Sequence, residues 1–211
     1  MRLILLFIML VWLPVFAQTG DGQPEDTVRL VEKTQFVSSK EMVVAGHPLA
    51  VAAGAEILKD GGSAVDAMVA VQMVLNLVEP QSSGIGGGAF LLHHDAETQQ
   101  VVAIDGREVA PALATEHLFL DDSGEARSWP DVVPGGLSVG IPGTLALMKH
   151  AHAKFGRLPW GKLFDHAIQH AEMGFPVSPR LAGSLNSYGG QRLKQFDEAR
   201  RYFFPDGKPL A

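Results

Sequence analysis

The sequence predicts an α+β fold, because runs with helical spacing and runs with the length of strands both occur beyond residue 40. Nearly every residue from Ala64 to Val78 is apolar, which indicates a helix buried on most of its sides. Two short apolar runs follow, Ala89–His93 and Val101–Asp105, and the polar segment between them predicts a β-hairpin. Helical spacing returns from 144 to 173. The fold class rests on this core helix, the hairpin and the later helices.

Capping residues mark the predicted helix boundaries. Pro48 suits a first helical turn, and Gly61 predicts the end of the helix that it opens. Ser63, with Asp66 three residues later, forms a variant of the capping box and predicts the start of the core helix. That helix also carries two polar residues that should find hydrogen-bond partners, Gln72 and Asn76.

Two more strands and two more helices are predicted around these elements. Met42–Ala45 is a short apolar run consistent with a buried strand, and Leu137–Ile141 predicts another. Thr144 is expected to be the N-cap of a helix that ends near Gly156. A further helix is expected from Trp160 until Gly174.

Residues 1–17 have the pattern of a secretory signal peptide. Arg2 supplies a positive charge before the apolar run Leu3–Phe16, and Val15 and Ala17 are the small residues before a cleavage site. The apolar run is shorter than the roughly 20 residues that a membrane-spanning helix needs. We therefore expect cleavage after Ala17, a periplasmic or secreted protein and no stable membrane anchor; an uncleaved anchor is the alternative.

Composition describes a globular protein without a basic surface. Residues 18–40 form a polar lead-in, and order should begin near residue 41. The net charge of −6 argues against nucleic acid as a partner. The sequence has no cysteine, which excludes disulfides, thiolate catalysis and cysteine metal sites.

The glycine cluster Gly84–Gly88 is the first candidate for chemistry. A dinucleotide-binding loop lies between a strand and the helix that it opens, whereas here a helix precedes the glycines and a strand follows them. The Lys-Ser/Thr pair of a phosphate-binding loop is also missing. The better interpretation is a tight backbone passage beside the core or a ligand.

Histidine and serine residues give no convincing catalytic or metal-binding pattern. His166 and His170 have a helical spacing that can bind zinc, but they lack the glutamate of the metalloprotease motif and a third ligand. We expect solvated side chains and no metal site there. Ser82 and Ser83 are not placed between glycines, as the serine of a nucleophile elbow would be.

Arg107 is a stronger candidate because it follows the end of the second predicted hairpin strand, next to Gly106. An arginine fixed at a strand end can hold a carboxylate through two parallel hydrogen bonds. The alternative is a salt bridge with Asp105 or Glu108, and spacing alone favours that alternative.

Six segments carry a resemblance when they are read together. They are HPLAVAAGAEILKDGGSAVDA (47–67), EPQSSGIGGGAF (79–90), DGREVAP (105–111), SVGIPGT (138–144), FGRLPW (155–160) and GFPVSPRLA (174–182). In this order they resemble the γ-glutamyltransferase family, whose members are also called glutathione hydrolases. Separated motifs in order are far more specific than any one of them. By this resemblance, residues 41–211 are the N-terminal part of the family's large subunit.

The resemblance implies an N-terminal-nucleophile hydrolase fold, an αββα sandwich that is incomplete in this chain. It implies a precursor that cuts itself into a large and a small subunit. The new N-terminal threonine of the small subunit then attacks γ-glutamyl amides such as glutathione, and the resulting ester is released to water or to an amino-acid acceptor. No metal or organic cofactor is implied. The implied partners are γ-glutamyl small molecules and the rest of the same precursor.

The same resemblance assigns Arg107 to the α-carboxylate of the γ-glutamyl group, which reverses the preference for a salt bridge. Glu108 is a weaker candidate, as a residue that orients Arg107. In the family, the nucleophile lies in a threonine-rich motif that opens the small subunit. Nothing in residues 1–211 matches that motif, so we expect no catalytic residue in this chain and no turnover by it alone. Two alternatives stay open: a non-catalytic exported scaffold or binding protein derived from the family, and a relative that acts on β-lactam side chains.

Overall fold

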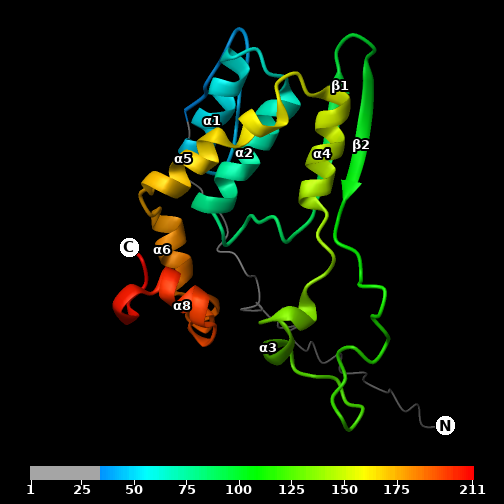
Figure 1. Ribbon diagram of the computed structural model, residues 1–211, viewed down its shortest axis with the longest axis vertical. Helices are drawn as coiled ribbons and strands as arrows, with labels where there is room; N and C mark the ends of the chain where they lie inside the picture. The colour runs from blue at the N-terminus through cyan, green and yellow to red at the C-terminus, as the bar shows by residue number, and fades with distance from the viewer. Residues whose placement is uncertain (1–33) are drawn as a thin grey trace, which may run out of the picture. The chain divides into compact units, whose positions relative to one another are not determined.

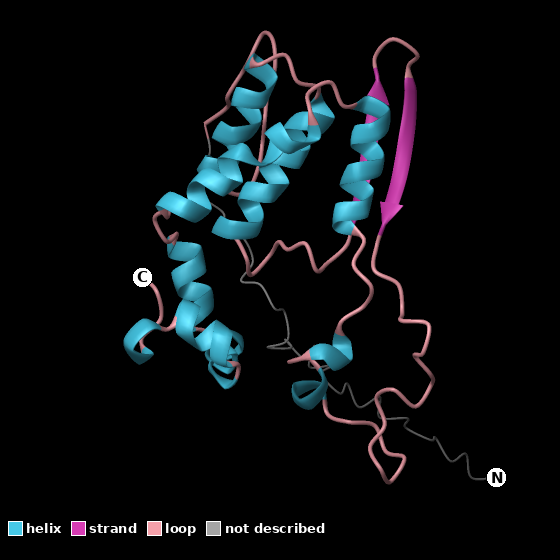
Figure 2. Cartoon of the chain, in the orientation of Figure 1, coloured by secondary structure: helices cyan, strands magenta, loops and turns pink. Residues whose placement is uncertain are grey.

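The computed structural model describes residues 34–211, and these residues form an α+β chain as predicted (Figures 1 and 2). The predicted signal peptide 1–17 and residues 18–33 of the lead-in lie outside the described residues. The helices and strands are α1 Pro48–Lys59, α2 Ala64–Val78, β1 Ala89–Asp95, β2 Gln100–Gly106, α3 Trp129–Val132, α4 Thr144–Phe155, α5 Asp165–Met173, α6 Pro179–Asn186, α7 Tyr188–Gln191 and α8 Asp197–Phe203, with short 3-10 turns at Gly136–Ser138, Trp160–Phe164, Arg192–Gln195 and Pro205–Gly207.

The α2 helix is the central helix of the core, as its all-round apolar sequence predicts. It contacts α1, α4, α5 and the 3-10 turn Trp160–Phe164. Val69, Ala70 and Val74 in its middle are completely buried. Burying a valine or leucine side chain contributes about 1.5–3 kcal/mol. The main cluster of buried residues joins α2 to α1, α4 and the 3-10 turn: Ile57, Ala67, Val69, Ala70, Met73, Leu147, Met148 and Leu163.

The predicted caps of α1 and α2 are confirmed. Pro48 begins α1, and the N-cap is His47, whose Nδ1 accepts a hydrogen bond from Leu49 N at 3.2 Å. The sequence does not predict this role for a histidine. Ser63 Oγ accepts from Asp66 N at 3.1 Å, and Asp66 Oδ2 accepts from Ser63 N at 2.8 Å, which completes the capping box. The caps therefore satisfy one backbone N–H group at the start of α1 and two at the start of α2.

The predicted hairpin is also confirmed. β1 and β2 are antiparallel, with Ala89 opposite Gly106 and Asp95 opposite Gln100. Side chains alternate between two faces: Ala89, Leu91 and Ile104 pack against the core cluster. The other face leaves Phe90, Leu92 and Val101 more than half exposed. Figure 1 shows α4 beside the hairpin, and α4 contacts both strands and α2.

The two additional strands are not formed, and those predictions were wrong. Met42–Ala45 has no strand partner among the described residues. Val43 lies against Gly54 of α1 instead, and Ala45 packs on the second core cluster of α1 and α2. Leu137–Ile141 contains part of a 3-10 turn, and only its last residue makes an isolated bridge, to Val109.

Two details of the later helices also differ from the prediction. Thr144 is the first residue of α4 rather than its N-cap, which is Gly143. The helix predicted from Trp160 until Gly174 begins as the 3-10 turn and continues as α5; Leu163 in the turn is buried, and Ile168 in α5 is half exposed. Among residues 34–211, no helix is long and apolar enough to cross a membrane.

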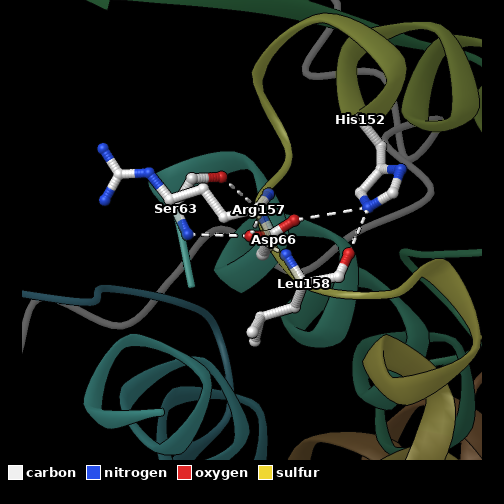
Figure 3. Close-up of polar contacts among 5 residues, drawn as sticks. All are labelled: Ser63, Asp66, His152, Arg157 and Leu158. Atoms are coloured by element: carbon white, nitrogen blue, oxygen red, sulfur yellow. Dashed lines mark hydrogen bonds and ion pairs between the residues drawn. The ribbon is translucent and has the colours of Figure 1, made fainter. Parts of the chain in front are cut away.

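Asp66 is a completely buried carboxylate that joins the start of α2 to the segment after α4 (Figure 3). Its Oδ2 accepts hydrogen bonds from Arg157 N at 2.8 Å and Leu158 N at 3.1 Å, in addition to the bond from Ser63. His152 Nε2 lies 2.9 Å from Leu158 O and 3.5 Å from Asp66 Oδ1. Because a carbonyl oxygen only accepts, Nε2 carries a hydrogen. The motifs 47–67 and 155–160 therefore meet at Asp66.

Asp66 should make the protein sensitive to acid. Burial raises the pKa of this carboxyl, but the backbone N–H donors of Ser63, Arg157 and Leu158 outweigh burial, so the pKa is lowered. A lowered pKa contributes stability above the unfolded value of about 3.9, and this stability is lost as the pH falls through the folded value. We expect the free energy of unfolding to fall below about pH 4, and to fall less steeply in Asp66→Asn. Denaturant unfolding of both proteins across pH 2.5–6 measures this; equal slopes would contradict it.

Candidate functional site

Arg107 follows the last residue of β2, as the sequence predicts. Its backbone N–H donates a hydrogen bond to Asp105 Oδ1 at 2.9 Å. Its side chain is exposed, and within residues 34–211 its guanidinium forms no ion pair with Asp105, Glu108 or any other carboxylate. The salt bridge that spacing alone favours is therefore not formed. The guanidinium is left available for a ligand.

The backbone around Arg107 is held by glycines of two other segments. A Cβ atom added to Gly88 would lie 2.8 Å from Arg107 Cα and 2.8 Å from Glu108 N, closer than real Cβ atoms approach. A Cβ atom added to Gly143 would collide with the carbonyl group of Gly106, and one added to Gly140 would lie 2.9 Å from Glu108 Cβ. Glycine is required here by close backbone approach. The tight passage that the sequence predicts for Gly84–Gly88 is confirmed only at Gly88, beside the turn after β2; a Cβ atom added to Gly86 would meet nothing within 4 Å.

Hydrogen bonds tie the same segments together. The carbonyl of Gly87 accepts from Gly143 N at 3.0 Å and from Thr144 N at 3.1 Å, so a loop carbonyl satisfies the first N–H groups of α4. Val109 and Ile141 exchange two backbone hydrogen bonds, of 3.4 and 2.9 Å. The glycine loop, the turn after β2 and the start of α4 therefore form one unit, which we call the glycine junction (84–88, 106–109 and 140–144).

A polar cavity of about 420 Å³ lies on this junction. Glu108, Gly88 and Thr144 line it together with Ser82 and Ser83. Arg107 is not among its lining residues. The structure therefore brings Glu108 to the cavity wall and leaves Arg107 outside it. In the part of the chain that the structure describes, Glu108 forms no ion pair with the Arg107 guanidinium, so the prediction that Glu108 orients Arg107 gains no support.

Polar side chains fix the start of the glycine loop. Gln72 Nε2 donates to Asn76 Oδ1 at 2.9 Å and to Ser83 Oγ at 2.6 Å, and Ser83 Oγ donates to Asn76 Oδ1 at 2.8 Å. The prediction that Gln72 and Asn76 find partners is confirmed. Asn76 Nδ2 is buried without a partner in the described part of the chain. Ser83 is thus held as a structural residue, which agrees with its rejection as a nucleophile.

A second anchor of the loop comes from α6. Arg180 forms an ion pair with the buried carboxylate of Glu79 and donates to Ser82 Oγ at 2.8 Å. Ser178, the N-cap of α6, donates to Glu79 Oε1 at 3.4 Å. This contact is not predicted from the sequence. The sequence features that could have indicated this contact are the arginine in the motif 174–182 and the glutamate that opens the motif 79–90.

The histidines do not converge on the junction. His166 Nε2 lies 3.5 Å from Glu56 Oε2, between α5 and α1. His93 stacks on Phe155 with ring centroids 4.1 Å apart. Among residues 34–211, no group of three or more His, Asp or Glu side chains is arranged to hold a metal ion. His93 makes a packing contact, and the side chain of His166 lies beside a carboxylate and is only 23% exposed, so it is less solvated than the sequence predicts.

Comparisons with known proteins agree with the motifs. The sequence profile described as Gamma-glutamyltranspeptidase matches residues 50–211. The chain is 42% identical over 174 residues to the glutathione hydrolase proenzyme of Bacillus subtilis strain 168, which covers 82% of this chain and 29% of that protein. It is 39% identical over 184 residues to the acylase ACY 1 proenzyme of Pseudomonas sp. strain SE83, which covers 85% of this chain and 33% of that protein.

The fold gives the same result. The crystal structure of Helicobacter pylori gamma-glutamyltranspeptidase matches with a TM-score of 0.74 and 34% identity, over 86% of this chain and 51% of that chain. The chain thus spans about a third or less of the length of the curated relatives described above. The profile match, the identities and the structural match together show that the chain belongs to the gamma-glutamyltranspeptidase family.

Proposed function

We propose that this chain is the N-terminal part of the large subunit of an exported enzyme that hydrolyses glutathione and transfers its γ-glutamyl group. Arg107 binds the α-carboxylate of that group. The observation that carries the proposal is the exposed, unpaired guanidinium of Arg107 among the described residues, in a family of glutathione hydrolases. The signal peptide pattern of residues 1–17 supports export to the periplasm or beyond.

The geometry around Arg107 suits recognition of a carboxylate. A guanidinium offers two parallel N–H donors to the two oxygens of a carboxylate, and lysine cannot reproduce this pairing. The junction holds the backbone of Arg107 through Gly88, and Asp105 accepts its N–H. Less entropy is lost on binding when the donor is already held in place. Arg107 therefore contributes to substrate binding and orientation, while the covalent steps belong to other residues.

The covalent chemistry is proposed to lie outside residues 1–211. A threonine at the start of a small subunit attacks the γ-glutamyl carbonyl carbon and expels the amine, and water or an amino acid then releases the γ-glutamyl ester. No residue of the chain takes part in these bond changes, and no cofactor is needed for them. The proenzyme names of the relatives support a precursor that matures by cleavage.

The exposed face of the hairpin supports an incomplete αββα sandwich. Phe90, Leu92 and Val101 point away from the core cluster and are 65%, 77% and 64% exposed. Soluble proteins rarely leave an apolar sheet face open. We propose that the remainder of the precursor covers it with a second sheet. A purified chain that is monomeric, soluble and cooperative in melting would instead favour the non-catalytic scaffold.

A second candidate is an acylase that removes β-lactam side chains. It is favoured by the 39% identity to the acylase ACY 1 proenzyme. The two candidates differ in the acyl group that the complete enzyme would remove. Hydrolysis of glutathione and of a cephalosporin by the complete enzyme separates them.

The test of Arg107 uses the complete precursor after maturation. Because hydrogen bonds to charged groups contribute about 1.5–3 kcal/mol, Arg107→Lys is expected to raise the KM for glutathione by about 10- to 100-fold. Discrimination against a γ-glutamyl donor whose α-carboxylate is a carboxamide should shrink by a similar factor. Steady-state release of glutamate measures both quantities.

Arg127→Lys is the matched control for that experiment. Arg127 is also exposed, in the connection from β2 to α4, and its Nε donates to Leu120 O at 3.0 Å. Its replacement should leave the KM and the discrimination unchanged. If Arg107→Lys keeps the KM and the discrimination of the natural enzyme, the assigned role of Arg107 is wrong.

A further inference from the structure

We propose that Asp105 is a positioning residue for Arg107, and that it acts through the backbone hydrogen bond rather than through its charge. This inference rests on the proposed role of Arg107 in carboxylate binding. Asp105 lies on the exposed face of β2, opposite Phe90. Asp105 is not part of the core cluster, so it does not stabilise the fold through burial.

Arg107 is the first residue after the end of the hairpin. Ala89, the first residue of β1, pairs with Gly106, so Arg107 has no strand partner. Within residues 34–211 its N–H is accepted by the Asp105 side chain, at 2.9 Å. Without this bond, Arg107 N–H would have to be satisfied by water and the turn would lose its polar restraint. An aspartate that accepts from the N–H two residues later stabilises such a turn locally.

Asp105 is the polar member of a set of restraints on this turn. Gly88 approaches Arg107 Cα from the glycine loop, and Gly143 approaches the Gly106 carbonyl from the start of α4. The Gly143 contact restricts the carbonyl side of the peptide group between Gly106 and Arg107, and the Asp105 bond holds its N–H side. The Asp105 bond fixes the orientation of the peptide group between Gly106 and Arg107, and so sets the direction in which the Arg107 side chain leaves the chain.

The hydrogen bond from Arg107 N–H to Asp105 also leaves the Asp105 carboxylate and the Arg107 guanidinium unpaired with each other. Asp105 Oδ1 is used by a backbone N–H, and Asp105 forms no ion pair with the Arg107 guanidinium in the described part of the chain. A carboxylate paired with the guanidinium would compete with the substrate carboxylate for the same donors. Asparagine can accept the same N–H hydrogen bond without the charge, and alanine cannot. The two substitutions therefore separate the bond from the charge.

The test measures the KM and kcat for glutathione in the complete matured enzyme. One hydrogen bond contributes about 1 kcal/mol, so Asp105→Ala is expected to raise the KM about fivefold with kcat changed less than about twofold. Asp105→Asn should stay within about twofold of the natural enzyme in both constants. If Asp105→Ala fails to mature, Asp105→Ser replaces it, since a hydroxyl accepts the bond more weakly and should give an intermediate KM.

Asp95→Ala is the matched control. Asp95 Oδ1 accepts from Glu97 N at 2.8 Å and Thr98 N at 3.1 Å, so it makes the same kind of turn bond at the other end of the hairpin. Asp95→Ala should lower the melting temperature at least as much as Asp105→Ala, because it removes two bonds rather than one, and leave the KM unchanged. An equal rise of KM in Asp95→Ala would show a general effect of hairpin stability and overturn the proposal.

Arg107→Lys in the same assay distinguishes a failure of the positioning role of Asp105 from a failure of the proposed function. A raised KM in Arg107→Lys with an unchanged KM in Asp105→Ala overturns the positioning role alone. An unchanged KM in Arg107→Lys overturns the proposed function, and the role of Asp105 with it. A KM raised as much by Asp105→Asn as by Asp105→Ala assigns the effect to charge and also overturns the proposal.

Discussion

Replacing Gly143 by alanine is expected to lower the free energy of unfolding by about 3 kcal/mol or more, the upper end of overpacking effects. Gly143 has φ −118° and ψ −19°, a conformation open to any residue, so the cost comes from space alone. The added Cβ would meet the carbonyl oxygen of Gly106 and lie 2.6 Å from its carbonyl carbon. Both are backbone atoms and cannot rotate away.

The junction must move apart to relieve that collision. A shift of Gly143 would stretch the hydrogen bonds that Gly143 N and Thr144 N donate to Gly87 O, of 3.0 and 3.1 Å. It would also displace the turn that carries Arg107. We therefore expect Gly143→Ala to combine a lower free energy of unfolding with a higher KM for glutathione in the complete enzyme.

Denaturant unfolding with Gly183→Ala as the control measures the effect. Gly183 lies within α6, and an added Cβ there has nothing within 4 Å. Alanine at an open helical position is expected to stabilise by about 0.5–1 kcal/mol. A Gly143→Ala protein as stable as the natural one would show that the glycine junction does not depend on this close approach.

The glycine junction also illustrates what the sequence could and could not predict. The order of helix, glycines and strand indicates a tight backbone passage at Gly84–Gly88, and the structure has such an approach at Gly88 but not at Gly84 or Gly86. The partners of that passage, in 106–109 and 140–144, are distant in the sequence, and no periodic pattern connects them. The place of Arg107 follows from the end of β2, and an aspartate two residues before it is a local signal for the acceptor of its backbone N–H.

The wrong strand predictions have a related cause. Met42–Ala45 and Leu137–Ile141 have the composition of strands, yet a strand also needs a partner at its edge. Val43 and Ala45 find apolar partners on α1 and α2 instead. In contrast, α2 and the hairpin are predicted well, because capping residues and alternation act within a few residues of one another. Local sequence signals were sufficient for α2 and the hairpin, whereas contacts between residues far apart in the sequence determined the conformation of the two segments wrongly predicted as strands.

Asp66→Ala is expected to lower the free energy of unfolding by about 4 kcal/mol, which is exceptional for one substitution. It removes the acceptor of three backbone N–H groups, those of Ser63, Arg157 and Leu158, at a site with no exposed surface (Figure 3). Each buried N–H group left without a partner costs about 1–3 kcal/mol. The sequence predicts Asp66 as part of a capping box but does not predict its bonds to residues that lie far along the chain.

Asp60→Ala is the control, because Asp60 also joins an early segment to a late one. Asp60 Oδ2 accepts from Lys162 Nζ at 2.7 Å, but both side chains are close to half exposed. Water replaces such a pair readily, so Asp60→Ala should change the free energy of unfolding far less than Asp66→Ala. Hydrogen exchange should locate the difference: the amides of Arg157 and Leu158 lose protection in Asp66→Ala and keep it in Asp60→Ala. Equal destabilisation by the two variants would mean that the buried bonds of Asp66 do not hold the start of α2 to the segment after α4.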